Sequence, residues 1–283
     1  MTLDRRLNAF RPDLAETSLR GKVEAERFVE GSKAQVSVPV VALRSKPDLA
    51  AGIDTELLMG EEVIVFERSN GWCWVKAIAD GYVGYLPETA VREGAAATHI
   101  VVPQRTFVYP EPELRKPHVT VLSMGSRVRV TGTAEARGNH YAVLEDGTAI
   151  FAKHVQPIGF DDGGDYVDVA LRFLETPYLW GGRSGLGIDC SGLVQLALSM
   201  TGRAAPRDTD MQAAGLGEPI AREELKRGDF VFWKGHVAIM EDAETIVHAN
   251  GHTMTVTREN FAAAVERIGW LYEYPTGYRR LVG

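Results

Sequence analysis

The sequence predicts an α+β domain preceded by two small β-barrels. Two observations favour this fold class: short β-rich runs fill residues 35–158 in a repeating pattern, and helical stripes followed by strand-like runs fill the remainder. The 283 residues, 45% hydrophobic and 24% charged, have an ordinary globular composition. Domains usually hold about 100–200 residues, so a chain of this length is expected to form two or three.

The charge balance excludes several classes of partner. Lys and Arg number 31 and Asp and Glu number 38, which gives a net charge of −7. An acidic chain has no field that attracts DNA or RNA, so we expect no nucleic-acid partner. No window approaches about 18 consecutive apolar residues, so no membrane insertion is expected. The sequence leaves the oligomeric state open.

Cysteine usage and the first residues bear on the compartment. The two cysteines, Cys73 and Cys190, are too few to stabilise a protein of this size through disulfides. So low a cysteine count is typical of proteins in a reducing compartment. Residues 1–33 are polar and charged and lack the apolar stretch of a secretory signal. We therefore expect a cytoplasmic protein in which residues 1–33 form a leader segment that packs on a later domain.

Residues 35–158 contain a duplicated β-rich pattern. Short apolar runs alternate with Gly, Asn, Asp and Pro, which is typical of a small barrel or sandwich. Three landmarks recur at a spacing of 65 or 66 residues: Pro47 and Pro112, Met59-Gly60 and Met124-Gly125, Asp80-Gly81 and Asp146-Gly147. So constant a spacing predicts two tandem domains, 34–92 and 98–158. Both resemble bacterial SH3-like domains, small barrels that often accompany cell-wall enzymes.

Residues 160–283 predict the α+β domain, after a linker and helix entry at residues 160–165. Two stretches carry apolar residues at helical spacing and four later runs are strand-like: 166–174 and 193–200 for the helices, 230–233, 236–240, 245–249 and 253–256 for the strands. Thr176-Pro177 is expected to end the first helix. Helices followed by antiparallel strands are typical of an α+β domain.

Cys190 is the candidate nucleophile. It precedes the second helical stripe, where free backbone N–H groups and the helix dipole stabilise a thiolate and bind an oxyanion during acyl transfer. The alternative is a buried, unreactive cysteine, but the flanking Asp189, Ser191 and Gly192 are unusual in a packed core. Cys73 lies between two tryptophans in a strand-like run, so we expect it to serve packing.

A cysteine nucleophile needs a base, and two of the seven histidines are suited to this role. His236 and His248 fall in adjacent strand-like runs. A three-residue loop centred on Asp242 pairs them directly across the ladder, with Cβ atoms about 4.5–5.5 Å apart. His236 is then the base and His248 the group that orients it. Two half-exposed strand histidines are the alternative, and His252 is the rival third member.

Metal chemistry is not expected at these residues. One cysteine and two distant histidines match no compact zinc-ligand spacing.

The motifs around these residues resemble the NlpC-type cysteine peptidases over about residues 160–275. The matching segments occur in the family's order: Thr176-Pro-Tyr-Leu-Trp-Gly-Gly-Arg183, Gly187-Ile-Asp-Cys-Ser-Gly-Leu-Val194, Pro206-Arg-Asp-Thr209 with Gln212, Gly228-Asp-Phe-Val-Phe232, His236-Val-Ala-Ile-Met240 and Ile246-Val-His-Ala249. The resemblance implies a papain-like cysteine peptidase fold and no cofactor. It also implies hydrolysis of bacterial wall peptides between D-γ-glutamate and a diamino acid. Cys190 matches the nucleophile, His236 the base and His248 the orienting residue.

Further roles follow from the same resemblance. Tyr178 matches the tyrosine near the oxyanion site, and Asp189 and Ser191 match residues that line the substrate pocket. Thr209 stands where several members have serine, which preserves a hydroxyl. A core aromatic is the alternative role for Tyr178, and a helix N-cap is the alternative for Asp189.

The order of domains resembles that of the recycling dipeptidyl-peptidases. In these enzymes the first SH3-like domain blocks part of the groove and recognises a free N-terminal L-alanine. Glu61 and Tyr82 are our candidates for this contact, with turn or strand-edge positions as their alternative roles. The implied partners are peptidoglycan-derived peptides, L-Ala-γ-D-Glu-diamino acid. Two other functions stay open: an exported endopeptidase that acts on intact peptidoglycan, and a catalytically dead protein that binds wall fragments.

Overall fold

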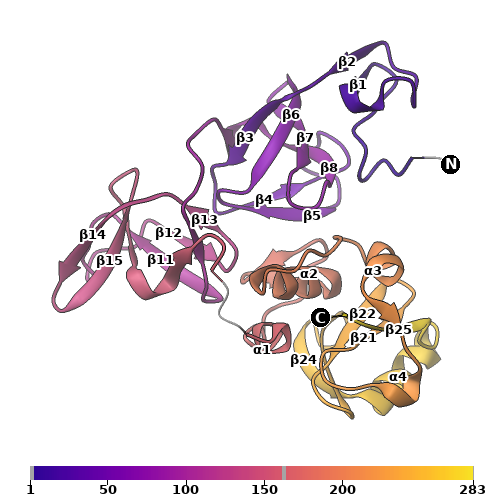
Figure 1. Cartoon of the computed structure of the whole chain (residues 1–283). Helices are drawn as coiled ribbons and strands as arrows, with labels where there is room; N and C mark the ends of the chain where they lie inside the picture. The colour runs from indigo at the N-terminus through magenta and orange to yellow at the C-terminus, as the bar shows by residue number, and fades with distance from the viewer. Residues whose placement is uncertain (1–2, 161–163, 283) are drawn as a thin grey trace. The chain divides into compact units, whose positions relative to one another are not determined.

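A computed structural model describes residues 3–160 and 164–282, and the chain divides into two compact units (Figure 1). The first unit comprises residues 1–158 and the second residues 159–283. Part of the predicted linker, residues 161–163, and the first two residues of the predicted leader lie outside the described residues. Within the described ranges, no helix is long and apolar enough to span a membrane.

The leader packs on the first β-rich domain. It contains strands β1 (Leu14–Glu16) and β2 (Arg27–Val29), which pair in parallel, and a 3₁₀ helix η1 (Thr17–Leu19). Ala9 and Leu14 are fully buried in one cluster with Trp74 and Val83. The Arg11 guanidinium lies over the Trp74 ring at 4.4 Å from its centroid, a cation–π contact.

The first β-rich domain is a small two-sheet barrel. Its elements are β3 (Ser32–Val36), β4 (Val40–Leu43), β5 (Thr55–Leu58), β6 (Glu62–Ser69), β7 (Trp72–Ala77), β8 (Val83–Pro87), η2 (Glu88–Ala90) and β9 (Val91–Arg92). Five strands form a sheet in the order β8-β7-β6-β3-β9, and β4 pairs with β5. Alternate apolar side chains from both sheets, Cys73 among them, fill the core.

The second β-rich domain repeats these features. Its elements are β10 (His99–Val101), β11 (Arg105–Tyr109), β12 (Thr120–Ser123), β13 (Arg127–Val128), β14 (Val130–Ala136), β15 (Asn139–Leu144), β16 (Ala149–Phe151), η3 (Ala152–His154) and β17 (Val155–Pro157). Each domain has one long hairpin with a register shift, between Val65 and Glu67 in the first and between Val130 and Gly132 in the second. Gly60 and its predicted counterpart Gly125 both have φ in the left-handed region, at 76° and 87°.

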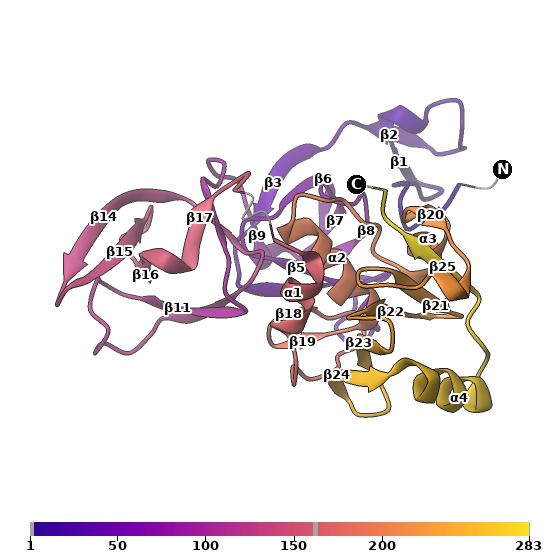
Figure 2. The ribbon, with the colours of Figure 1, turned by 60° about the horizontal axis from the view of Figure 1, so that its bottom comes forward.

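The second unit is built on a six-stranded sheet in the order β20-β25-β21-β22-β23-β24. Its elements are α1 (Tyr166–Leu171), β18 (Arg183–Ser184), β19 (Gly187–Ile188), α2 (Cys190–Met200), α3 (Thr209–Gly215), β20 (Glu218–Pro219), η4 (Arg222–Glu224), β21 (Phe230–Trp233), β22 (His236–Met240), β23 (Thr245–Asn250), β24 (Thr255–Asn260), α4 (Phe261–Leu271) and β25 (Gly277–Arg280). Helices α2 and α4 cover opposite sides of this sheet (Figures 1 and 2).

Helix α4 seals one face of the sheet. Apolar residues of β21, β22 and β23 meet those of α4 in one buried cluster: Val231, Trp233, Ala238, Met240, Ile246, Phe261, Ala264, Val265 and Ile268. The sequence interpretation did not include α4. Its start follows the usual rule, because the Asn260 side chain caps it by accepting from the Ala263 N–H at 3.1 Å.

The first predicted helix is shorter than expected. Helix α1 ends at Leu171, not at Thr176, and the chain continues through overlapping turns in which Phe173 and Leu174 donate to carbonyls three residues earlier. Glu175 has φ 66°, a left-handed conformation that stops any helical continuation. The Thr176-Pro177 pair therefore follows the turns and does not itself end the helix.

Candidate active site

Cys190 is the first residue of α2. Asp189, with φ −98° and ψ 178°, is the N-cap: its carboxylate accepts the Gly192 N–H at 2.7 Å, and its carbonyl accepts the Leu193 N–H at 2.9 Å. The thiol is therefore fixed at the helix N-terminus, as the sequence predicts, and Cys190 is 6% exposed.

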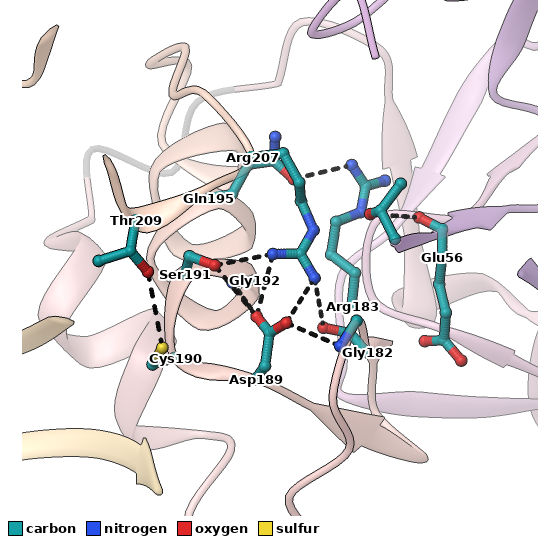
Figure 3. A network of polar contacts seen from close by, with 12 residues as sticks. Glu56, Gly182, Arg183, Asp189, Cys190, Ser191, Gly192, Gln195, Arg207 and Thr209 are labelled. Carbon is teal, nitrogen blue, oxygen red and sulfur yellow. Dashed lines mark hydrogen bonds and ion pairs between the residues drawn. The ribbon is translucent and has the colours of Figure 1, made fainter. Parts of the chain in front are cut away.

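A buried arginine holds the cap in place (Figure 3). Arg207 is 1% exposed, and its guanidinium donates two hydrogen bonds to Asp189, at 3.0 and 2.7 Å. It also donates to the Ser191 hydroxyl at 2.8 Å, and the Gly181 N–H donates to the Asp189 carboxylate at 2.9 Å. Asp189 and Ser191 thus lie in a support network beneath the nucleophile, while their predicted contact with substrate stays a prediction.

A close backbone approach brings the preceding loop against α2. A Cβ at Gly192 would lie 2.4 Å from the carbonyl oxygen of Gly182, closer than any real Cβ contact. Glycine at this helical position therefore allows the loop that carries Gly181 and Gly182 to reach the helix N-terminus.

Two further polar groups surround the sulfur. The Thr209 hydroxyl, at the start of α3, lies 3.8 Å from Cys190 Sγ, and the backbone N–H of Val237 also faces the sulfur. Gln212 is fully buried, and its side-chain amide donates to the carbonyls of Ser191 at 3.0 Å and Pro206 at 2.8 Å, which ties α3 to α2.

The thiol keeps its proton at rest. Burial raises the pKa of Cys190 to about 11 and the Asp189 charge adds to the rise, whereas the Val237 N–H, the Thr209 hydroxyl and Arg207 act against it. The helix dipole alone predicts a thiolate, and here burial outweighs it. Cys190 therefore needs a base to accept its proton during attack.

Tyr178 lies close enough to Cys190 and Asp189 for their charges to affect the pKa of its hydroxyl. Burial, followed by the charges of Cys190 and Asp189, raises the pKa of the Tyr178 hydroxyl above its ordinary value. Tyr178 also forms an isolated bridge with Ile188, two residues before the nucleophile. A phenol that holds its proton is a hydrogen-bond donor suited to a developing oxyanion.

The two predicted histidines, His236 and His248, lie within hydrogen-bond distance of each other. His236 Nε2 lies 2.9 Å from His248 Nδ1, and their ring planes are inclined at 62°. Burial and the neighbouring His248 lower the pKa of His236, and burial also lowers that of His248. Both rings are therefore neutral at pH 7, and a neutral imidazole can accept the thiol proton.

The predicted strand register is wrong. Ile239 pairs with Val247 and Met240 with Ile246, so the three-residue loop is centred on Ala243 and not on Asp242. Asp242 instead begins the loop, where its carboxylate accepts the backbone N–H groups of Glu244 and Thr245, both at 2.8 Å.

The histidines nevertheless remain neighbours. Moving the loop centre by one residue moves the register by two, which leaves every side chain on the same face of the sheet. His236 and His248 are therefore diagonal partners across the ladder, a separation that two imidazole rings can span. His252, the rival third member, is exposed in the turn after β23, where its backbone N–H donates to Asn250.

Two residues that the sequence interpretation missed complete the site. Glu259, in β24, lies 3.1 Å from His248 Nε2 through its Oε2 atom. Arg267, in α4, donates to both oxygens of Glu259, at 2.9 and 2.6 Å. Neither residue stands in a recognisable motif, because only the pairing of β23 with β24 and the packing of α4 bring them to His248.

The candidates in the first unit lie in its β-rich domain. Glu61 is 7% exposed, and its carboxylate accepts the Leu58 N–H at 2.8 Å within the β5–β6 turn. Tyr82 is 5% exposed and belongs to the domain core. Glu61 thus occupies a turn, as in its alternative role, whereas Tyr82 contributes to the core, and a contact with substrate stays a prediction for both.

The second unit thus places the Cys190 thiol beside the backbone of Val237, the residue that follows the imidazole base His236, with the Thr209 hydroxyl also near the sulfur. This arrangement is suited to acyl transfer through a thioester: the base takes the thiol proton, and the donors stabilise the oxyanion. Among residues 3–160 and 164–282, no group of three or more His, Cys, Asp or Glu side chains is placed to hold a metal ion.

Two family descriptions match the chain. Residues 43–91 match "Bacterial dipeptidyl-peptidase Sh3 domain", and residues 175–268 match "NlpC/P60 family". The first match identifies the first β-rich domain as an SH3 domain. The second spans Cys190, His236 and His248.

Curated proteins with similar sequences support the same family. The chain is 27% identical over 263 residues to "Dipeptidyl-peptidase 6" of Lysinibacillus sphaericus, covering 81% of this chain and 96% of that protein. It is 26% identical over 226 residues to "Gamma-D-glutamyl-L-lysine dipeptidyl-peptidase" of Bacillus cereus, covering 70% and 67%. It is 30% identical over 186 residues to a "Probable endopeptidase" of Corynebacterium glutamicum, covering 64% and 87%.

A solved structure shares the fold. The crystal structure of an NlpC/P60 family protein from Bacillus cereus aligns with a TM-score of 0.74 at 21% identity, covering 89% of this chain and all of that one. Since the fold, the sequence relatives and the family description agree, we conclude that this chain belongs to the NlpC/P60 family and is a cysteine peptidase with an N-terminal SH3 domain.

Proposed function

We propose that the enzyme hydrolyses the γ-D-glutamyl–diamino acid bond of cell-wall peptides that carry a free N-terminal L-alanine. The dipeptide L-Ala-γ-D-Glu is the product, and the reaction serves the recycling of peptidoglycan fragments. As part of the same proposal, we place the reaction in the cytoplasm and assign the second β-rich domain to the SH3-like class.

One observation carries the proposal. A domain of the "Bacterial dipeptidyl-peptidase Sh3 domain" family, at residues 43–91, is joined in one chain to the peptidase domain. Two of the similar proteins are named for dipeptidyl-peptidase activity, and the name of one specifies the γ-D-glutamyl-L-lysine bond. The repeated hairpin shift and left-handed glycines support the assignment of the second β-rich domain.

The geometry of the site supports each chemical step. Cys190 Sγ attacks the γ-glutamyl carbonyl carbon while its proton passes to His236. The backbone N–H of Cys190 and the Tyr178 hydroxyl are the proposed donors to the oxyanion. His236 then gives the proton to the leaving amine, and water hydrolyses the thioester. Each proton taken up by His236 is returned, so the enzyme ends the cycle unchanged.

Mass spectrometry of defined peptides tests the proposal. The full-length protein is incubated with L-Ala-γ-D-Glu-L-Lys, with the meso-diaminopimelate analogue and with their N-acetylated forms, and Cys190→Ala serves as the inactive control. We expect release of L-Ala-γ-D-Glu from the free peptides. N-acetylation should lower kcat/KM by roughly a hundredfold, the scale expected when a site built for a charge is left unpaired.

Other outcomes separate the remaining functions. Equal cleavage of N-acetylated peptides or of whole sacculi would favour an endopeptidase that acts on intact peptidoglycan, outside the cytoplasm. Binding of wall peptides without turnover would favour a catalytically dead binding protein. In the same assay, Glu61→Gln and Tyr82→Phe test whether these two residues recognise the free amine, since only a recognition role reduces the difference between free and acetylated peptides.

A further inference from the structure

A row of polar side chains extends from the base into the second unit. His236 Nε2 lies 2.9 Å from His248 Nδ1, and His248 Nε2 lies 3.1 Å from Glu259 Oε2. Arg267 Nη2 donates to the same Oε2 atom at 2.6 Å, and Arg267 Nε donates to Oε1 at 2.9 Å. The four residues come from β22, β23, β24 and α4.

The chemistry of these groups fixes where the protons lie. His248 Nε2 lies 3.1 Å from Glu259 Oε2 without forming a hydrogen bond to it, but an ionised carboxylate at this distance repels a lone pair, so the hydrogen of His248 belongs on Nε2. In a neutral ring the other nitrogen, Nδ1, is then an acceptor, and His236 Nε2 must donate to it. His236 is left with its hydrogen on Nε2 and a lone pair on Nδ1. That lone pair is what the Cys190 thiol needs.

We propose that Glu259, itself held by Arg267, is a positioning residue that fixes the tautomer of His248 and thereby keeps His236 Nδ1 ready to accept the thiol proton. The proposal rests on the peptidase activity of the family and not on the choice of wall peptide. Glu259 acts only through His248, so it is not a catalytic residue. No proton passes to the carboxylate: the thiol proton stays on His236 until the leaving amine takes it.

The electrostatics of Glu259 agree with an acceptor-only role. Burial alone would raise its pKa, but the close contact with His248 and the hydrogen bonds from Arg267 outweigh burial and lower it to about 2. Glu259 is therefore ionised throughout the working pH range. His248 is fully buried at its side chain, whereas the side chains of Glu259 and Arg267 are 21% and 22% exposed.

The two partners of this ion pair act in opposite directions on the histidines. The charged groups that act on His248 are Glu259 from β24 and Arg267 from α4, and the titratable His236 from β22 also contacts it. Burial lowers the pKa of His248, the Glu259 contact raises it, and the Arg267 charge lowers it. Removal of Glu259 should therefore move the titration of the histidine pair to lower pH, and removal of Arg267 should move it to higher pH.

Alkylation of Cys190 by iodoacetamide measures this effect without any assumption about substrate. The rate is followed from pH 2 to 9 on the full-length protein, so that the range includes the His236 pKa of about 3, with mass spectrometry to separate Cys190 from Cys73. In Glu259→Gln we expect the plateau rate to fall about tenfold, since an amide no longer enforces one tautomer. We also expect its acid limb to shift to lower pH. In Arg267→Met we expect a smaller fall and a shift to higher pH.

A matched control is available in the same sheet. Arg258 Nε donates to Glu241 Oε2 at 2.6 Å, and Arg258 points to the opposite face from its chain neighbour Glu259. Glu241→Gln therefore breaks a similar ion pair on the other face and should leave the alkylation profile unchanged. On any peptide that the wild type cleaves, Glu259→Gln should lower kcat and leave KM unchanged.

The opposite directions of the two pH shifts distinguish a positioning role of Glu259 from a purely structural role of the Glu259–Arg267 pair. If Glu259 and Arg267 only stabilise the fold, both variants break the same ion pair and their profiles shift alike or not at all, which overturns the proposal. If Glu259→Gln does not fold, Arg267→Met still tests the proposal. A shift of its acid limb to higher pH supports the proposal, and an unchanged acid limb contradicts it. Failure of the wall-peptide assay with these shifts present would refute only the proposed substrate.

Discussion

Replacement of Arg207 by Met isolates the contribution of the support network beneath the nucleophile. Arg207 is 1% exposed at its side chain and Asp189 is 10% exposed, and two hydrogen bonds of 3.0 and 2.7 Å join them. Met retains much of the side-chain volume but leaves the Asp189 carboxylate buried without its cation. Removal of one partner from a buried ion pair typically costs about 3–5 kcal/mol, and we expect a loss in this range.

The same change should alter the chemistry of Cys190. The Arg207 charge acts to lower the pKa of the thiol, whereas Asp189 acts to raise it. Arg207→Met therefore leaves only the unfavourable member of the pair, and alkylation of Cys190 should become slower at pH 8. Asp189→Asn in the same chain keeps a good N-cap side chain and removes the unpaired charge, so the double variant should recover part of the lost stability.

Urea unfolding of the full-length protein measures these effects, with pulse proteolysis to assign the transition to residues 159–283. Arg258→Met is the control, because Arg258 pairs with Glu241 at 2.6 Å but is 49% exposed. An exposed pair contributes about 0.2–1 kcal/mol. If Arg207→Met costs no more than Arg258→Met, or if Asp189→Asn gives no recovery, the proposed support network has been misinterpreted.

Three further predictions follow from the same unit. Cys190→Ala should abolish turnover with an unchanged circular dichroism spectrum, and iodoacetamide should label Cys190 well before Cys73, which is fully buried in the first β-rich domain, where burial raises the pKa of its thiol; equal labelling rates would contradict this. Gly192→Ala should lower activity and the urea midpoint together, because the added Cβ would meet the Gly182 carbonyl oxygen at 2.4 Å; a variant as stable and active as the wild type would contradict the close approach. Burial, followed by the charge of His248, lowers the pKa of His236 from 6.5 to about 3, so the unfolded chain binds more protons between these values and stability should fall as the pH drops below about 6.5, by about 1.4 kcal/mol per pH unit. His236→Gln should make that slope shallower without removing it, because burial also lowers the pKa of His248, and urea titrations at pH 4, 5, 6 and 7 will measure the difference.

The order of the β-rich and α+β parts along the chain and the position of the candidate nucleophile follow from the sequence. Cys190 between Asp189 and Ser191, directly before an apolar helical stripe, predicts a thiol at a helix N-terminus, and the structure shows it there. The constant spacing of the turn glycines predicts two β-rich domains, because a left-handed turn position favours glycine. The helix-start signal depends on residues within a few positions of one another, and the repeat is visible as a constant offset along the chain.

Some features that the sequence interpretation missed have a recognisable sequence pattern. Asn260 followed by Phe-Ala-Ala-Ala-Val265 is a capped start of a helix, and α4 begins there. Arg207 and Gln212 stood in the motif that carried the family resemblance, yet only their burial and contacts show that they tie Asp189, Ser191 and α3 together.

The pairing of distant residues depends on tertiary structure. Period-two alternation already places His236 and His248 on one face of the sheet, whichever residue centres the loop, and the sequence determines that much. The register itself depended on Asp242, whose carboxylate binds two backbone N–H groups at the start of the loop and displaces its centre to Ala243. Glu259 and Arg267 reach His248 only because β24 pairs with β23 and α4 packs on the same face, and the charge state of Cys190 is set by burial, which no local pattern encodes.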